Sequence, residues 1–339
     1  MDEAVQLAGA DLARERLSSL FDRHEWFART YALCPVSGTP LVINAAKGAV
    51  GAWLFLTKDD RGHARSLSSW YTLAFRPAFQ GSPTLDEQTR LLRALSRQLR
   101  QHVASATLAP MREDDCAAMA RVFSETGWFA LPRQTDCNWT ANVAGKSFAE
   151  YWAERPGQLR KTVKSKRKRA AMEVTIHDSF GDSAWADYES VYADSWKPEE
   201  GAAAFLQDMA RVEGCAGTLR LGIGKIAGQA VAAQLWTCEG GVAIAHKVAH
   251  RESAREFSPG SLLSAAMFEQ AIDVDRVDTI DFGTGNDAYK SIWMDRCAPL
   301  YTLDLYNKRS REGISAAARA IARKTLLSGR NRLSRLKER

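Results

Sequence analysis

The sequence of 339 residues lacks the patterns that mark several large classes of enzyme. Its six cysteines include no CxxC pair, and its six histidines are scattered without the short spacing of metal ligands. There is no HExxH motif and no Gly-x-Ser-x-Gly nucleophile elbow. We therefore expect neither a metal site nor a covalent enzyme intermediate.

Long apolar segments are also missing. The best apolar run, Gly48–Leu56, is too short to cross a bilayer. The first residues are acidic and mixed, without the apolar stretch of a signal peptide. We therefore expect a cytoplasmic protein whose cysteines remain thiols in a reducing compartment.

Positive charge is present, but in two places. Residues 155–169 carry eight Lys and Arg and no acid, and residues 307–339 carry eleven against two acids. Since the net charge is only +6, the rest of the chain is acidic. This excludes a uniformly basic nucleic-acid binder. The first segment reads as a solvated helix, or as a contact for phosphates, an acidic acceptor or RNA. The second reads as a helix on an anionic membrane or a partner, or as a frayed end.

Strand and helix signals follow the same order in the two halves of the chain. In the first half we predict strands at 41–43, 49–57, 68–74 and 106–110, and a helix at 85–103. In the second half we predict strands at 172–176, 218–224, 229–237, 242–249, 279–282 and 300–306, with helices at 183–196, 202–212, 261–272 and 287–294. This order predicts an α+β fold of two tandem domains, each a mixed, mostly antiparallel sheet flanked by helices. The predicted bounds are 1–145, a basic connecting helix at 146–171, a second domain at 172–308 and a basic helical tail at 309–339.

Four stretches of the second half carry a resemblance to a known family. They are YADSW (192–196), LRLGIGKIAGQAVAAQLWTCEGGVAIAHKVAH (219–250), EFSPGSLLSAAMFEQAI (256–272) and IDFGTGNDAYKSIWMD (280–295). Together they resemble the acetyltransferase family of the GNAT superfamily associated with cellulose and exopolysaccharide synthesis, which is related to the FemAB-type peptidyltransferases. The resemblance implies two GNAT-like domains, the first of them degenerate. It also implies acetyl-CoA or another acyl-CoA as co-substrate, and a small-molecule or saccharide acceptor.

The loop before the helix predicted at 261–272 is the expected site for the coenzyme A diphosphate. The first amides of a helix attract anions, and here they follow the end of a strand. The superfamily pattern Gln/Arg-x-x-Gly-x-Gly/Ala is matched by Arg255 and Gly260, whereas Ser258 replaces the first glycine and Pro259 has no N–H. The predicted amide cradle comprises Ser258, Gly260, Ser261 and Leu262. The alternative is an ordinary helix start.

The resemblance also assigns roles after the last short strand. Tyr289 would protonate the leaving thiolate, or else be a buried tyrosine with a satisfied hydroxyl. Lys290 would bind a phosphate or an acidic acceptor, or else be a solvated helix lysine. A backbone N–H near Val248 would hold the tetrahedral oxyanion.

An amine acceptor needs a general base, because it is almost fully protonated at neutral pH. His246 and Asp281 are the candidates. Regular alternation places His246 on one strand face with Val242, Ile244 and Val248, which favours a core histidine. Asp281, in a buried strand, is either the base or a cap for the amides of the glycine turn that follows.

Two other functions compete with an acyl-CoA-dependent N- or O-acyltransferase. A FemAB-like enzyme would take an aminoacyl group from tRNA, and the basic segments would contact the RNA. The basic run at 155–169 has no interleaved aromatics to stack bases, and the chain has no long coiled-coil arm. Nucleic acid is therefore a partner only under that alternative. A GNAT fold that binds without catalysis is the third reading, supported by the missing loop glycine.

Overall fold

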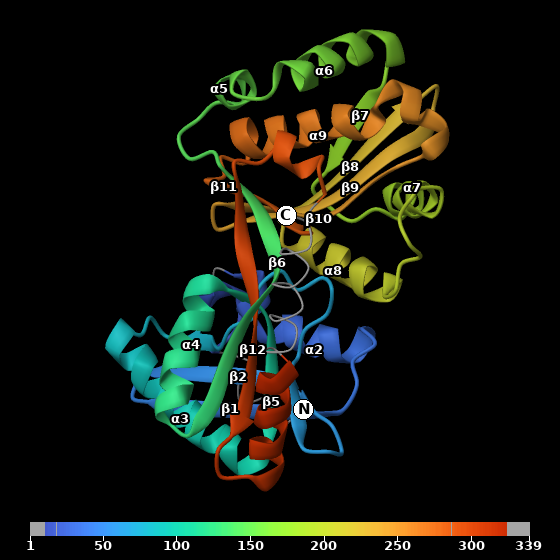
Figure 1. The fold of residues 1–339 in the computed structure, drawn as a ribbon. Coiled ribbons are helices and arrows are strands. Elements are labelled where there is room, and N and C mark those ends of the chain that lie inside the picture. The colour runs from blue at the N-terminus through green and yellow to red at the C-terminus, as the bar shows by residue number, and fades with distance from the viewer. Residues whose placement is uncertain (1–10, 18, 286, 324–339) are drawn as a thin grey trace, which may run out of the picture. The chain divides into compact units, whose positions relative to one another are not determined.

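The computed structural model describes residues 11–17, 19–285 and 287–323. Contacts divide the chain into two compact units (Figure 1). Unit 1 comprises residues 1–32, 36–135 and 300–339, and unit 2 comprises residues 33–35 and 136–299. Neither unit is continuous in sequence, because the long strands β6 (Trp128–Asn142) and β12 (Arg296–Asn307) each contribute to both units. The domain bounds given from the sequence remain a prediction.

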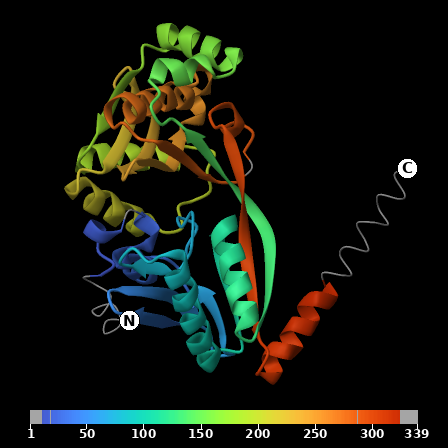
Figure 2. The ribbon, with the colours of Figure 1, turned by 90° about the vertical axis from the view of Figure 1, so that its left-hand side faces the viewer.

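Unit 1 is a sheet with helices packed against it. Its strands are β1 (Thr39–Lys47), β2 (Val50–Lys58), β3 (His63–Ser66), β4 (Ala78–Gln80) and β5 (Ser105–Arg112), and its helices are η1 (Arg14–Arg16), η2 (Leu20–Asp22), α2 (His24–Leu33), α3 (Leu85–His102) and α4 (Glu113–Glu125). The strand order is β1-β2-β3-β5-β12, with β4 beside β2. Only β3 and β5 pair in parallel within this order. Helices α3 and α4 lie side by side, as Figure 2 shows.

Unit 2 has the same arrangement with more elements. Its strands, besides part of β6, are β7 (Glu173–His177), β8 (Leu219–Ile226), β9 (Gln229–Glu239), β10 (Val242–His250) and β11 (Thr279–Thr284); its helices are α5 (Phe148–Ala153), α6 (Gly157–Ala170), α7 (Asp182–Ala193), α8 (Ala203–Cys215), η3 (Glu252–Phe257), α9 (Pro259–Glu269), η4 (Gln270–Val274) and η5 (Lys290–Ile292). The strand order is β6-β11-β10-β9-β8-β7, antiparallel except for β10 with β11. Helix α9, with α6 above it, covers one face of the sheet, and α7 covers the other (Figure 1). The predicted α+β class is confirmed.

Three sequence predictions about elements are wrong in detail. Residues 68–74 form no strand, because Ser68 turns its hydroxyl to the carbonyl of Ala109 instead of continuing the ladder of β3. The helix predicted at 287–294 is reduced to the single turn η5. The connecting segment 146–171 holds two helices, since Pro156 separates α5 from α6. Strands β3, β4 and β6 and helix α4 were not predicted at all. Of the predicted tail, residues 311–323 are helical and 324–339 lie outside the described residues.

The expectation that all cysteines are thiols is also wrong. Cys137 on β6 and Cys297 at the start of β12 form a disulfide, with their Cα atoms 5.9 Å apart. They are separated by 160 residues in sequence, so no local spacing could show the pairing. Cys116, Cys215 and Cys238 remain thiols.

Two kinds of feature are absent from the residues that the structure describes. None of the helices there combines the length and apolar character needed to span a bilayer. Nor do three or more His, Cys, Asp or Glu side chains gather there in a way that could hold a metal ion.

Candidate active site

The two parallel strands of unit 2 pair briefly and then separate. Val242–Ile244 of β10 pair with Thr279–Asp281 of β11. Within the described residues this pairing ends there, although β10 continues beside β9 as far as His250 and β11 continues beside β6. Both strands contain an irregularity just past the separation, and such bulges bend a strand. The sheet is therefore open between the carboxyl ends of β10 and β11, and Val248 lies on the β10 side of this opening.

Helix α9 begins beside the end of β10. Its first turn has no acidic residue and no side-chain cap. A Cβ atom added to Gly260 would lie 3.0 Å from Nδ1 of His250, so this close approach of the helix to the strand requires glycine or a shift of the ring. Ser258 has a φ of 53°, the left-handed region that glycine adopts most readily. This explains why a glycine is usual at that position of the superfamily loop.

The predicted cradle of four amides is smaller in the structure. The carbonyl of Ser258 accepts hydrogen bonds from the amides of Ser261 and Leu262, each at 3.1 Å, and the Ser258 amide donates to Arg255. Ser258, Ser261 and Leu262 are therefore corrections as amide donors, because their N–H groups are already hydrogen-bonded within the chain. Among the described residues, the Gly260 amide has no hydrogen-bond partner and is the donor that remains for an anion.

Cations surround this loop. Arg255 is exposed and forms an ion pair of 3.7 Å with Glu252. From α6, Nζ of Lys166 donates to the carbonyl of Glu256 at 2.5 Å, and Arg169 pairs with the Glu256 carboxylate at 3.2 Å. The basic helix therefore holds η3, the segment that leads into α9.

Asp281 is buried and acts as a cap. Nδ2 of Asn138 donates to both carboxylate oxygens at 3.0 Å, and the Gly283 amide donates to Oδ1 at 2.9 Å. The second reading of Asp281, a cap for the glycine turn, therefore holds. To act as a base, its carboxylate would have to give up these hydrogen bonds. Asn138 was missed because it comes from β6, far away in sequence.

His246 sits in the bulge of β10, so it does not follow the alternation assumed from the sequence. Its Nε2 lies 2.9 Å from Oγ1 of Thr237 on β9. Burial lowers the pKa of this imidazole to about 4. It is therefore neutral at pH 7 and a weak base, which favours the structural reading of His246.

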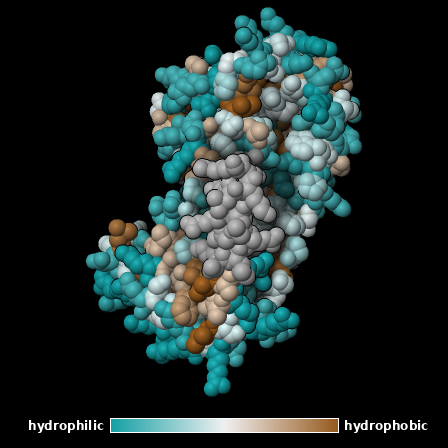
Figure 3. Space-filling model, viewed as in Figure 1, coloured by the Kyte–Doolittle hydropathy of each residue, from teal (hydrophilic) through white to brown (hydrophobic). Residues whose placement is uncertain are grey.

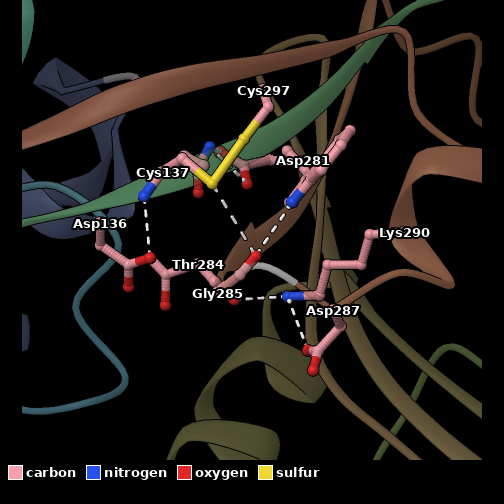
Figure 4. The surroundings of a disulfide bond; sticks show 10 residues. Asp136, Cys137, Asp281, Thr284, Gly285, Asp287, Lys290 and Cys297 are labelled. Carbon is pink, nitrogen blue, oxygen red and sulfur yellow. Dashed lines mark hydrogen bonds and ion pairs between the residues drawn. A yellow bond between two sulfur atoms is a disulfide. The ribbon is translucent and has the colours of Figure 1, made fainter. Parts of the chain in front are cut away.

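Tyr289 and Lys290 follow the glycine turn. Burial, and then the charge of Asp287, raise the pKa of Tyr289 to about 12, so its phenol keeps its proton at neutral pH. Lys290 is only 5% exposed, which overturns the reading of a solvated helix lysine. Its Nζ donates to the carbonyl of Thr284 and lies 3.6 Å from Asp287 (Figure 4). Burial lowers its pKa, against the effect of Asp287.

The sequence model of the acetyltransferase (GNAT) domain matches residues 157–291. This part of the chain is a GNAT-fold domain. The match includes the separated strands, the start of α9 and both residues that follow the glycine turn.

Solved structures resemble nearly the whole chain. FemX is 11% identical, with 90% of this chain and 96% of that chain covered and a TM-score of 0.60. The C-terminal domain of a putative lysylphosphatidylglycerol synthetase from Agrobacterium fabrum is 11% identical, with 94% and 96% covered and a TM-score of 0.57. L-PGS from Bacillus licheniformis is 10% identical, with 93% and 94% covered and a TM-score of 0.58. At these identities the likeness is one of fold. No curated protein sequence matches the chain significantly.

The GNAT-fold domain also contains a cavity that the sequence did not predict. It has a volume of about 450 Å³ and lies between α7 and α8. Its lining includes Trp185, Tyr188 and Tyr192 of α7, and Lys197, Glu199 and Glu200 of the loop after α7. The helical spacing of the three aromatic residues was the available signal, but it only predicted a helix.

One residue of β10, the strand that borders the opening, contacts the lining of this cavity. Lys247 of β10, next to the bulge, pairs with Glu200 at 2.6 Å, and its Nζ lies 5.3 Å from the centre of the Tyr192 ring. Burial lowers the pKa of Lys197. Nε1 of Trp185 is buried without a hydrogen-bond partner among the described residues.

Proposed function

We propose that the chain is an acyltransferase that moves an acetyl or other acyl group from acyl-CoA to an amine or hydroxyl. The observation that carries the proposal is the opening between β10 and β11 with the uncapped start of α9 beside it. Both features fall within the residues that match the GNAT domain. No metal takes part, and the acceptor attacks the thioester directly.

On the donor side, the diphosphate would lie against the start of α9. The Gly260 amide, the positive end of the helix dipole and the cations of α6 and η3 favour an anion there. The acyl carbonyl would lie beside Val248, where a backbone N–H would stabilise the oxyanion. Tyr289 would give its proton to the departing thiolate.

On the acceptor side, we assign the cavity between α7 and α8. Aromatic faces suit the body of a small molecule or sugar, and the carboxylates of Glu189 and Glu199 suit an amine. Neither His246 nor Asp281 is well placed as base, for the reasons given above.

The biological setting remains the one implied by the family resemblance. The acceptor would be a sugar amine or hydroxyl in the synthesis of a cell-surface polysaccharide, handled in the cytoplasm. The tail that begins with residues 311–323 would allow peripheral contact with a membrane.

Acetyl-CoA binding followed by turnover tests this proposal. We expect acetyl-CoA to raise the Tm, and thiol release to appear when amino sugars and neutral sugars are supplied as acceptors. Binding with no turnover across both acceptor classes would favour a non-catalytic module. No binding at all would contradict the proposal.

One observation favours a second candidate, a FemAB-like aminoacyl-tRNA-dependent transferase. Helix α6 exposes Lys161, Lys164, Arg167 and Lys168, which have no ion-pair partner among the described residues. Figure 3 shows hydrophilic side chains where Figure 1 labels α6. Such a row of cations suits a polyanion. Stabilisation by charged tRNA but not by acetyl-CoA would favour this candidate over the first.

A further inference from the structure

The disulfide lies beside Gly285, where the turn that leads to Tyr289 begins. The carbonyl of Cys137 accepts a hydrogen bond of 3.2 Å from the amide of Gly285. Two residues along β6, the indole N–H of Trp139 donates to the carbonyl of Gly285 at 2.9 Å. The same Cys137 is bonded through its sulfur to Cys297 (Figure 4). One residue of β6 therefore contacts both the beginning and the end of the segment 285–297.

This segment has little regular structure of its own. In its described residues, 285 and 287–297, the three-residue turn η5 is the only helix, so other contacts must hold Tyr289 in place. Its far end is anchored independently of the disulfide. Tyr151 and Arg155 donate to the carbonyl of Trp293 at 2.6 and 2.8 Å, and the Asp295 amide donates to Thr140 at 3.1 Å. The near end, at Gly285, depends on Cys137 and Trp139.

We propose that the Cys137–Cys297 disulfide is a redox-sensitive clamp that positions the turn leading to Tyr289. The role of Tyr289 in this inference rests on the proposed function. With the disulfide formed, β6 and the start of β12 are joined beside Gly285. With it broken, the segment loses its covalent link to β6 at Cys297, and hydrogen bonds alone hold both its ends to that strand. The two cysteines are positioning residues, since neither reaches the reacting atoms itself.

The switching step needs a dithiol reductant. One of its thiolates attacks a cystine sulfur and breaks the S–S bond, giving a mixed disulfide and one cysteine thiol. Its second thiol displaces the other cysteine and leaves as the oxidised, cyclic disulfide. Two electrons and two protons pass to Cys137 and Cys297. Both residues are partly exposed, so a small dithiol can reach them.

Transfer kinetics and hydrogen exchange, measured on the oxidised protein and on protein treated with dithiothreitol, test the clamp. Thiol alkylation with mass spectrometry assigns the state of each cysteine. We expect reduction to lower kcat about 10-fold, because Tyr289 loses its alignment. We expect the KM for acetyl-CoA to change by less than about 3-fold, because the start of α9 is untouched. Exchange of the amides at 285–292 should become about 10-fold faster.

Variants separate this clamp from general stabilisation. The double variant Cys137→Ser with Cys297→Ser should show the reduced values under both conditions, and Cys215→Ser, an exposed thiol elsewhere in unit 2, should respond like the wild type. Equal kcat and equal exchange in the two forms, or no disulfide after oxidation, would overturn the proposal. If the protein transfers no acyl group, the exchange measurement still decides whether the clamp exists, and only the proposed function fails.

Discussion

The two units begin their main helix in opposite ways. In unit 1 the N-cap of α3 is Thr84. The amide and the hydroxyl of Thr84 donate hydrogen bonds to the Glu87 carboxylate at 2.9 and 2.8 Å. Asp86 adds a second acid to this first turn. In unit 2 the first turn of α9 has neither a side-chain cap nor an acid. An anion is thus built into the start of α3, whereas the start of α9 is left for an external one.

The parallel strands beside these helices differ in the same sense. Residues His63–Arg65 of β3 pair in parallel with β5, as β10 does with β11. In unit 1 side chains keep the two strands linked beyond this pairing, since the hydroxyls of Ser66 and Ser68 donate to the carbonyl of Ala109 in β5 at 2.6 and 2.9 Å. In unit 2 the strands separate. A few residues therefore decide whether this order of elements leaves room for a donor, and we predict one acyl-CoA site per chain, in unit 2.

The largest expected effect comes from Tyr289, which has no equivalent in unit 1. There the strand β5 is followed by the regular helix α4 of 13 residues. Tyr289→Phe should lower kcat by about 10²–10⁴-fold, because it removes the proton donor to the thiolate. The Kd for acetyl-CoA should stay the same. Tyr301→Phe in unit 1 is the matched control, and kcat within a few-fold of wild type for Tyr289→Phe would refute the assignment.

The next prediction compares Asp281 of β11 with Thr107 of β5, each the third residue of its strand in the parallel pairing. Asp281→Ala should lower the free energy of unfolding by about 3 kcal/mol, because Asn138 and the Gly283 amide lose a buried charged acceptor. Thr107→Ala at the equivalent place in β5 should cost about 1 kcal/mol, since only its hydrogen bond to Asp304 is lost. Urea unfolding measures both. Equal losses of unfolding free energy would show that the buried Asp281 carboxylate stabilises the fold no more than the Thr107 hydroxyl does.

The pH dependence of stability gives a smaller effect. The pKa of His246 is about 4 in the folded chain against an ordinary 6.5, so the unfolded chain binds more protons between these values. The free energy of unfolding should therefore fall as the pH drops from 6.5 to 4, and be fully restored above 6.5. His246→Gln should remove about 1–2 kcal/mol of this change. An unaltered pH profile would contradict the burial of this imidazole, and the exposed His102→Gln serves as control.

The smallest effect concerns the cap of α3. Glu87→Gln should lower the free energy of unfolding by about 0.5–1 kcal/mol, because the capping carboxylate is lost. It should leave the stoichiometry of acetyl-CoA at one, since the strands beside α3 stay connected. A second bound acetyl-CoA in calorimetry would show that the cap of α3 alone prevents acetyl-CoA from binding to unit 1.

The sequence predicted the parts of unit 2 that depend on local patterns. Strands β8 to β10 and helix α9 were found within a few residues, because alternation, glycine turns and helical spacing mark them. The bulge at His246 was missed, since alternation assumes a regular strand. The pairings of Asn138 with Asp281 and of Cys137 with Cys297 were missed because β6 brings together segments that are distant along the chain. Leu262 was assigned a free amide because the loop pattern does not show which amides the helix uses itself.

The central claim is that the start of α9 holds the diphosphate of acyl-CoA because it lacks an anion of its own. Ser261 occupies the helix position that Glu87 occupies in α3, the third residue after the N-cap. Calorimetric titration of acetyl-CoA into Ser261→Glu tests the claim, with Ser261→Ala as control. We predict one acetyl-CoA per chain for the wild type and the control, and a Kd at least about 30-fold higher for Ser261→Glu, since the added carboxylate repels the diphosphate. An unchanged Kd in a folded Ser261→Glu protein would contradict the account.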